Sequence, residues 1–170
     1  MKSKKNLVLI GMMGSGKSTI GSLLAKKLNF QFFDIDKIIE TENKMKIVQI
    51  FEKKGESFFR KLEEKTSLKY LNVPNSVISL GGGGFINENI RKEATMQSKT
   101  FWLKWDANTL IRRIKLSTKR PLAMSLKNSE LKELMIKRSK IYAKTKFGIN
   151  CEKLTKIEIV KKIINLYEKN

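Results

Sequence analysis

The chain has 170 residues, 41% hydrophobic and 31% charged, a composition that suits one folded domain and excludes a disordered chain. Its 36 basic and 16 acidic residues give a net charge of +20, but the lysines are spread along the whole length, so genome base composition explains them better than a nucleic-acid surface does. One cysteine and no histidine exclude an internal disulfide, a multi-cysteine metal site, zinc chemistry and a histidine general base.

The first part of the chain predicts a strand, a glycine-rich loop and a helix. Asn6–Ile10 is a short apolar run bounded by lysines and a glycine, as in a buried strand. Lys17–Leu28 carries apolar residues at helical spacing. Between them, Gly11–Ser18 has the pattern Gly-x4-Gly-Lys-Ser, which is typical of a phosphate-binding loop.

Glycines in such a loop let the backbone curl and point its N–H groups at phosphate oxygens, and the next helix adds the partial positive charge of its N-terminus. Lys17 would then reach the β- and γ-phosphates, and the Ser18 hydroxyl would bind Mg²⁺. A chance glycine turn is the alternative. The strand before the loop and the helix after it favour a site for a nucleoside triphosphate.

A second predicted strand, Gln31–Ile35, ends in the triplet Asp34-Ile35-Asp36. Side chains two residues apart on a strand share a face. One carboxylate could therefore lean toward Mg²⁺ while the other accepts the proton of a substrate hydroxyl. The alternative is that an aspartate only caps a helix that begins near Lys37.

The next segment predicts two helical stretches, around Ile47–Glu52 and from Glu56 to about Leu71. Arg60 lies in the second stretch. It either forms a salt bridge with Glu63 or Glu64 one turn on, or faces a ligand.

Val77–Leu80 predicts a buried strand that stops at the glycine run Gly81–Gly84. Four successive glycines permit close approach of the backbone to a ligand. This explanation is favoured over a flexible turn, for which four glycines would cost needless conformational entropy. Thr100–Leu103 predicts a further strand, followed by a helix from Ala107 to about Ile114.

The polar segment Ser117–Asn128 contains Arg120-Pro121 and predicts a mobile loop, whose arginine would be either solvated or closed over the γ-phosphate. The next helix places Arg138 on an apolar stripe with Leu131, Leu134, Met135 and Tyr142. An inward-facing arginine needs a partner, and Arg138 together with Arg60 would clamp a carboxylate or phosphate. Phe147–Asn150 predicts a last strand before a final helix.

Strands that alternate with helices predict an α/β fold with a parallel sheet covered on both faces. In such sheets, ligands bind beyond the carboxyl ends of the strands. Gly11–Ser18, Asp34–Asp36 and Gly81–Gly84 all follow predicted strands. We therefore expect these three segments to form one site in a single domain.

Together these residues resemble the shikimate kinase family. The matching pieces are Gly11–Gly21, Phe33–Asp36 with Ile39 and Glu40, Ile50 and Phe51, Gly55 and Glu56, Phe59 and Arg60 with Glu63, Ser79–Gly83, Arg113, Arg120–Leu122, and Arg138 with Tyr142. They follow the order and spacing of the family over roughly residues 6 to 145. The resemblance implies the three-layer P-loop kinase fold of nucleoside monophosphate kinases, in which helices flank a central parallel sheet and a lid loop closes the site.

The resemblance also implies that the γ-phosphoryl group of ATP passes to the 3-hydroxyl of shikimate, in the pathway to chorismate and the aromatic amino acids. The implied catalytic residues are Lys17, Asp36 and Arg120, with Asp36 as the base. The implied ATP-binding residues are Gly14, Ser15, Gly16, Lys17, Ser18, Thr19, Arg113 and Arg120. The implied shikimate-binding residues are Asp36, Arg60, Gly81, Gly82, Gly83 and Arg138, and the implied Mg²⁺ site is Ser18 with Asp34. Arg113 would pack beside adenine, and Cys151–Thr155 matches the other adenine-side segment loosely.

One domain, 1–170, is expected, with a substrate-binding subdomain at about 34–62 and a lid at about 112–128. The chain departs from the family at Asn43 and Lys44, where a glycine is usual, and at Ala123–Ser125, where a second leucine is common in the lid. The first departure would alter a turn in the substrate-binding subdomain.

Three alternatives stay open. A related small-metabolite kinase such as a gluconate kinase is the nearest, and a basic ATP-binding module that acts on nucleic acid is a different class. A kinase-like domain without catalysis would have no need of Lys17, Asp34, Asp36 and Arg120 together. With no apolar run that could span a membrane and no signal peptide, we expect a cytoplasmic monomer that binds ATP and shikimate but neither nucleic acid nor membrane.

Overall fold

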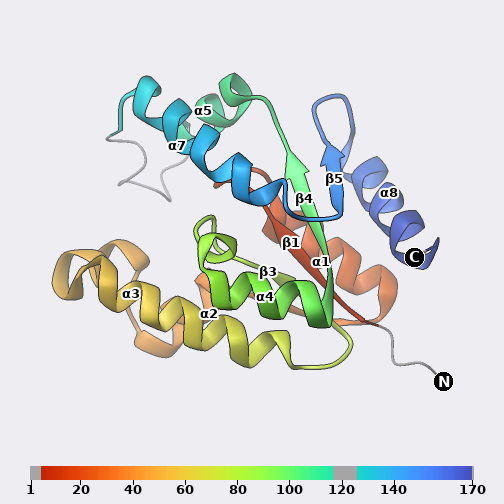
Figure 1. Ribbon diagram of the computed structural model, residues 1–170, viewed down its shortest axis with the longest axis horizontal. Coiled ribbons are helices and arrows are strands. Elements are labelled where there is room, and N and C mark those ends of the chain that lie inside the picture. Colours follow the sequence, from red (N-terminus) through yellow and green to blue (C-terminus); the bar gives the residue numbers. More distant parts are fainter. Residues whose placement is uncertain (1–4, 117–125, 170) are drawn as a thin grey trace.

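The computed structural model describes residues 5–116 and 126–169 (Figure 1). The elements in chain order are β1 Asn6–Ile10, α1 Lys17–Leu28, β2 Gln31–Asp34, α2 Ile35–Asn43, α3 Ile47–Leu71, β3 Ser76–Ser79, the short 3₁₀ helix η1 Gly84–Ile86, α4 Glu88–Gln97, β4 Ser98–Lys104, α5 Ala107–Lys115, α7 Asn128–Tyr142, β5 Phe147–Asn150 and α8 Lys156–Lys169. None of the helices within these described ranges has the length and apolar character needed to cross a membrane.

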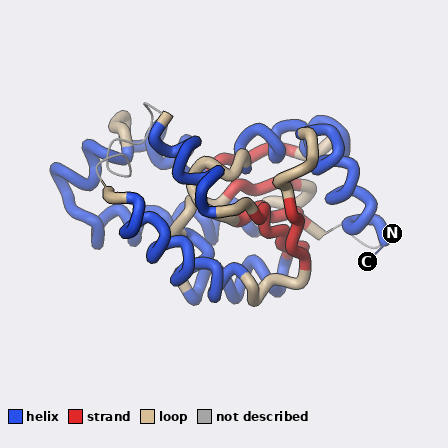
Figure 2. Tube along the Cα trace, turned by 90° about the horizontal axis from the view of Figure 1, so that it is seen from above, coloured by secondary structure: helices blue, strands red, loops and turns tan. Residues whose placement is uncertain are grey.

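The five strands form one parallel sheet in the order β2-β3-β1-β4-β5. β1 lies at its centre, where Leu9 pairs with Ser79 on one side and with Phe101 on the other. Figure 2 shows the strands between helices above and below them. The predicted α/β architecture is confirmed, and the carboxyl ends of all five strands lie along one edge.

Alternation along β1 divides the apolar interior between the two faces of the sheet. Val8 and Ile10 belong to a cluster with the side chains of α3, α4 and α7, whereas Leu7 and Leu9 belong to a cluster with α1 and α8. All four side chains are at most 1% exposed. Because successive side chains of a strand point to opposite faces, four consecutive apolar residues supply both cores.

Two features within residues 34–62 differ from the expected elements. β2 ends at Asp34 and α2 begins at once, so Asp36 lies in the first turn of a helix instead of at the end of a strand. The two helical stretches expected around Glu52 and Glu56 are joined as α3, with Gly55 at φ 81° and ψ 166° making a kink between them. Glycine suits this kink because it adopts positive φ without a Cβ clash.

Lys44, one of the two departures noted in the sequence, has φ 51° and ψ 32° as the residue that ends α2. Its N–H donates to the carbonyls of Glu40 and Thr41. This left-handed conformation closes many helices and is usually taken by glycine. The turn therefore keeps the backbone conformation of a glycine, and the Cβ of Lys44 makes that conformation less favourable than it would be for glycine.

Candidate functional site

The phosphate-binding loop leaves β1 at Ile10 and enters α1 at Lys17. Gly14 and Gly16 have φ of 79° and 89°, which only glycine adopts without strain. Lys17 is 7% exposed, and its ammonium donates to the carbonyls of Gly11 (2.8 Å) and Met12 (3.0 Å). The Lys17 side chain therefore folds back over its own loop, and its ammonium group lies at the start of that loop.

The first turn of α1 carries the two hydroxyl residues expected at a nucleotide site. Ser18 and Thr19 are exposed there. Ser15, by contrast, is 2% exposed, and its hydroxyl has no hydrogen-bond partner among the described residues. A buried polar group without a protein partner is unfavourable by itself.

Asp34 connects the phosphate-binding loop to the second strand. One carboxylate oxygen accepts a hydrogen bond from the Ser18 hydroxyl at 2.5 Å, and the other accepts one from the Lys37 backbone N–H at 3.3 Å, capping α2. The capping alternative is therefore confirmed, and the same carboxylate also contacts Ser18 of the phosphate loop, while a role of Asp34 at Mg²⁺ stays a prediction. The oxygens of Ser18 and Asp34 are hard ligands of the kind that Mg²⁺ prefers.

No group of three or more histidine, cysteine, aspartate or glutamate side chains in the described part of the chain could hold a metal ion by itself. Mg²⁺ at Ser18 and Asp34 would therefore need further oxygens, such as those of a nucleotide phosphate. Mg²⁺ bound by one or two protein ligands plus substrate phosphates is the usual arrangement in kinases.

Asp36 lies against the glycine run that follows β3. A Cβ placed on Gly81 would lie 2.6 Å from a carboxylate oxygen of Asp36 and also 2.6 Å from one of Glu63. No real Cβ approaches an oxygen so closely. Gly81 is therefore required for the approach of two carboxylates, one from α2 and one from α3.

Glu63 is the buried acid of this region, with 2% of its surface exposed. It accepts a hydrogen bond from Arg60 at 2.7 Å. Burial raises the pKa of Glu63, Asp36 adds to the shift, and the charges of Arg60 and Arg138 oppose it. An acid whose ionisation depends on its neighbours in this way belongs to an electrostatically coupled cluster of Asp36, Arg60, Glu63 and Arg138.

Arg60 forms the salt bridge with Glu63 that was one of its two alternatives, and its contact with a ligand stays a prediction. It forms salt bridges with Glu63 (2.7 Å) and Glu56 (3.0 Å), and a Cβ on Gly83 would collide with its guanidinium. Glu64, the other candidate partner, instead accepts hydrogen bonds from Asn87 and Asn89. Arg60 thus faces the glycine run while it is held by two glutamates.

Arg138 reaches the same glycine run from α7. A Cβ on Gly82 would lie 3.2 Å from a guanidinium nitrogen of Arg138 and 3.3 Å from the backbone nitrogen of Met13 in the phosphate loop. Gly82 therefore lies close to both. Two arginines and two acids from three helices meet the three glycines after β3 beside the phosphate-binding loop.

Arg113 lies on the other side of the phosphate loop. Its guanidinium stacks 3.8 Å from the centre of the Trp105 ring, and it donates weakly to the Gly14 carbonyl at 3.4 Å. The Trp105 indole N–H donates to the Ser15 carbonyl at 3.0 Å. Arg120 and the segment Ala123–Ser125 lie outside the described residues.

Sequence reasoning missed three residues of this region. Glu63 was considered only as a salt-bridge partner, Trp105 was not considered, and Tyr142, which donates to the Gly82 carbonyl, was placed on an apolar stripe without a role. Glu63 and Tyr142 lie one helical turn from Arg60 and Arg138, a spacing that could have drawn attention to them.

The comparisons with known proteins agree on one family. The family model described as shikimate kinase matches residues 13–168. A shikimate kinase of Persephonella marina is 44% identical over 161 residues, covering 94% of this chain and 97% of the relative. A shikimate kinase structure from Acinetobacter baumannii in complex with shikimate has a TM-score of 0.92 at 27% identity, covering 98% of this chain and 94% of that one.

The likeness to other small-metabolite kinases is weaker. A gluconokinase structure from Sinorhizobium meliloti has a TM-score of 0.63 at 15% identity, with 99% of this chain and 94% of that chain covered. At that identity the likeness concerns the fold alone.

Proposed function

This chain belongs to the shikimate kinase family and is an ATP-dependent phosphotransferase, and from this premise we propose how its own residues divide the reaction. The γ-phosphoryl group of ATP passes to the 3-hydroxyl of shikimate. The observation that carries the proposal is the position of Gly82, whose missing Cβ would contact both Met13 of the phosphate loop and Arg138 of the acceptor cluster. ATP, the phosphoryl donor, and shikimate, the acceptor, would therefore lie on either side of Gly82.

The donor half is the phosphate-binding loop, Gly11–Ser18, with Thr19 after it. Lys17 would exchange its two carbonyl partners for the β- and γ-phosphates, which offer stronger, charged acceptors. Ser18 and Asp34 would hold Mg²⁺ with the phosphates, and the ion would neutralise charge on the transferring group. Arg113, stacked on Trp105, would lie beside the adenine.

The acceptor half is the cluster at Gly81–Gly83. Arg60 and Arg138 carry the positive charge that binds the shikimate carboxylate, and the glycines allow the ring to approach the backbone. Asp36 would hydrogen-bond the reacting hydroxyl and accept its proton. Glu63 would hold Arg60 in place through their 2.7 Å ion pair.

Three further assignments are part of the proposal. Arg120, in a lid at about 112–128, would add a positive charge over the phosphates as the lid closes. Residues at about 34–62 would form the substrate-binding subdomain. The protein would act as a cytoplasmic monomer with ATP and shikimate as its only partners.

The test is a coupled assay of ADP release with MgATP and shikimate, in which gluconate and nucleoside monophosphates serve as control acceptors. We expect turnover that depends on shikimate and yields shikimate 3-phosphate. Folded protein that releases ADP with gluconate or a nucleotide, but not with shikimate, would contradict the proposal. Omission of Mg²⁺ should abolish turnover.

A further inference from the structure

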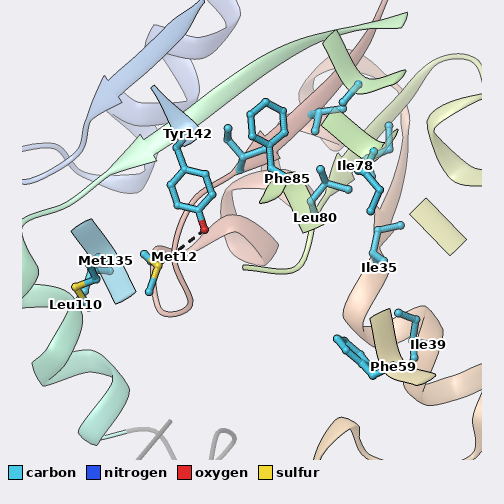
Figure 3. Close-up of a cluster of buried hydrophobic side chains, with 14 of the residues drawn as sticks. Met12, Ile35, Ile39, Phe59, Ile78, Leu80, Phe85, Leu110, Met135 and Tyr142 are labelled. Atoms are coloured by element: carbon cyan, nitrogen blue, oxygen red, sulfur yellow. Dashed lines mark hydrogen bonds between the residues drawn. The ribbon is translucent and has the colours of Figure 1, made fainter. Parts of the chain in front are cut away.

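Tyr142 contacts parts of both proposed half-sites, although it lies wholly inside the protein. It is the last residue of α7, one turn after Arg138, and is 1% exposed. Its ring packs against Trp102 with centroids 5.7 Å apart. Figure 3 shows its hydroxyl directed at Met12, which reaches up from the phosphate-binding loop.

The hydroxyl has a specific set of neighbours. It donates a hydrogen bond to the Gly82 carbonyl at 2.5 Å, and it lies 3.8 Å from the Met12 sulfur. A guanidinium nitrogen of Arg138 lies 3.9 Å from the same sulfur. The Tyr142 hydroxyl and the Arg138 guanidinium therefore both contact Met12, and the hydroxyl also holds the Gly82 carbonyl.

The bond to Gly82 needs the phenol proton. A carbonyl oxygen can only accept, so its partner at this place must be a donor, and the Tyr142 hydroxyl is that donor. Burial raises the pKa of Tyr142 to about 12, so the proton needed for the bond to Gly82 stays in place at neutral pH.

We propose that Tyr142 is a positioning residue for the acceptor: its hydroxyl holds the Gly82 carbonyl and so fixes the glycine run beside Arg138. This inference rests on the proposed function, because it takes the cluster at Gly81–Gly83 as the shikimate pocket. Tyr142 itself touches no substrate. It acts by holding a backbone segment that does.

The test is the Tyr142→Phe variant, which keeps the ring and its packing and removes one oxygen. We expect the KM for shikimate to rise about fivefold, since the loss of one uncharged hydrogen bond corresponds to that change. The KM for MgATP should stay within about twofold, because Lys17 and the loop glycines do not depend on this hydroxyl.

Tyr167→Phe is the matched control. The Tyr167 hydroxyl also donates to a backbone carbonyl, that of Lys5, at 2.5 Å, and burial raises its pKa as well. Tyr167 lies on α8, in the apolar cluster on the opposite face of the sheet. The control removes the same kind of bond away from the site, so both KM values should remain unchanged.

Four outcomes separate the possibilities. A rise in the shikimate KM with Tyr142→Phe but not with Tyr167→Phe supports the proposal. An equal effect of both variants, or none with Tyr142→Phe, overturns it, and so does a Tyr142→Phe chain that no longer folds, because the proposed effect is local. A folded wild-type protein without shikimate-dependent turnover contradicts the proposed function. In that case shikimate is titrated into the wild type and into Tyr142→Phe in a calorimeter, which tests Tyr142 without turnover. Equal dissociation constants for shikimate then overturn the positioning role of Tyr142.

Discussion

Gly81→Ala probes the closest approach in the acceptor cluster. The new Cβ would lie 2.6 Å from an oxygen of Asp36 and 2.6 Å from one of Glu63, where ordinary contact begins at 3.4 Å. One or both carboxylates must therefore retreat by about 0.8 Å. A misplacement of about 1 Å in a reacting group can cost about 100-fold in rate, so we expect kcat to fall by about that factor.

The assay is steady-state ADP release at saturating MgATP and shikimate, with thermal unfolding followed alongside to ensure that the variant is folded. Gly84→Ala is the matched control in the same glycine run, because its Cβ would meet Leu80 at 3.4 Å and Glu63 at 3.5 Å, which are ordinary contacts. We expect the control to keep kcat within about threefold of wild type. A folded Gly81→Ala protein with near-wild-type kcat would show that Asp36 need not occupy this position for catalysis.

Three further changes have separate consequences. Trp105→Phe keeps the ring under Arg113 but loses the bond to the Ser15 carbonyl, so the KM for MgATP should rise about fivefold with the KM for shikimate unchanged. Lys44→Gly removes a side chain from a left-handed position and should raise the free energy of unfolding, measured in urea, by about 0.5–1 kcal/mol. Glu63 has a pKa raised above 4.5, so the stability it contributes is present below that pH and is lost as the pH rises through the raised value. Glu63→Gln should therefore gain unfolding free energy relative to wild type as the pH rises from 4.5 through the raised pKa, and a constant difference would refute that sign.

Periodicity predicted the elements whose apolar residues recur at a regular spacing. β1 and β5 were predicted with the bounds that the structure has, and α1 likewise, because apolar residues at a fixed spacing leave few alternatives. α4 was missed because only Ile90 and Ala94 of its ten residues are buried, so no apolar stripe stands out. Its signal was Asn87, whose side chain caps the helix.

The sequence indicated which segments make the site but not how their side chains meet. Glycines after a strand predicted close approach, yet the groups that approach Gly81 come from α2 and α3. The bond from Trp105 to Ser15 spans 90 positions, and that from Tyr142 to Gly82 spans 60. Such contacts depend on tertiary packing, for which a single sequence has no local pattern.

The most direct test of the proposed site is kcat for shikimate-dependent ADP release in Asp36→Asn, which keeps the shape of the side chain and removes its charge. If Asp36 accepts the hydroxyl proton, kcat should fall by about 100-fold or more while the KM for MgATP stays near the wild-type value. A folded Asp36→Asn protein with kcat within a few-fold of wild type would contradict the assignment of Asp36 as the base.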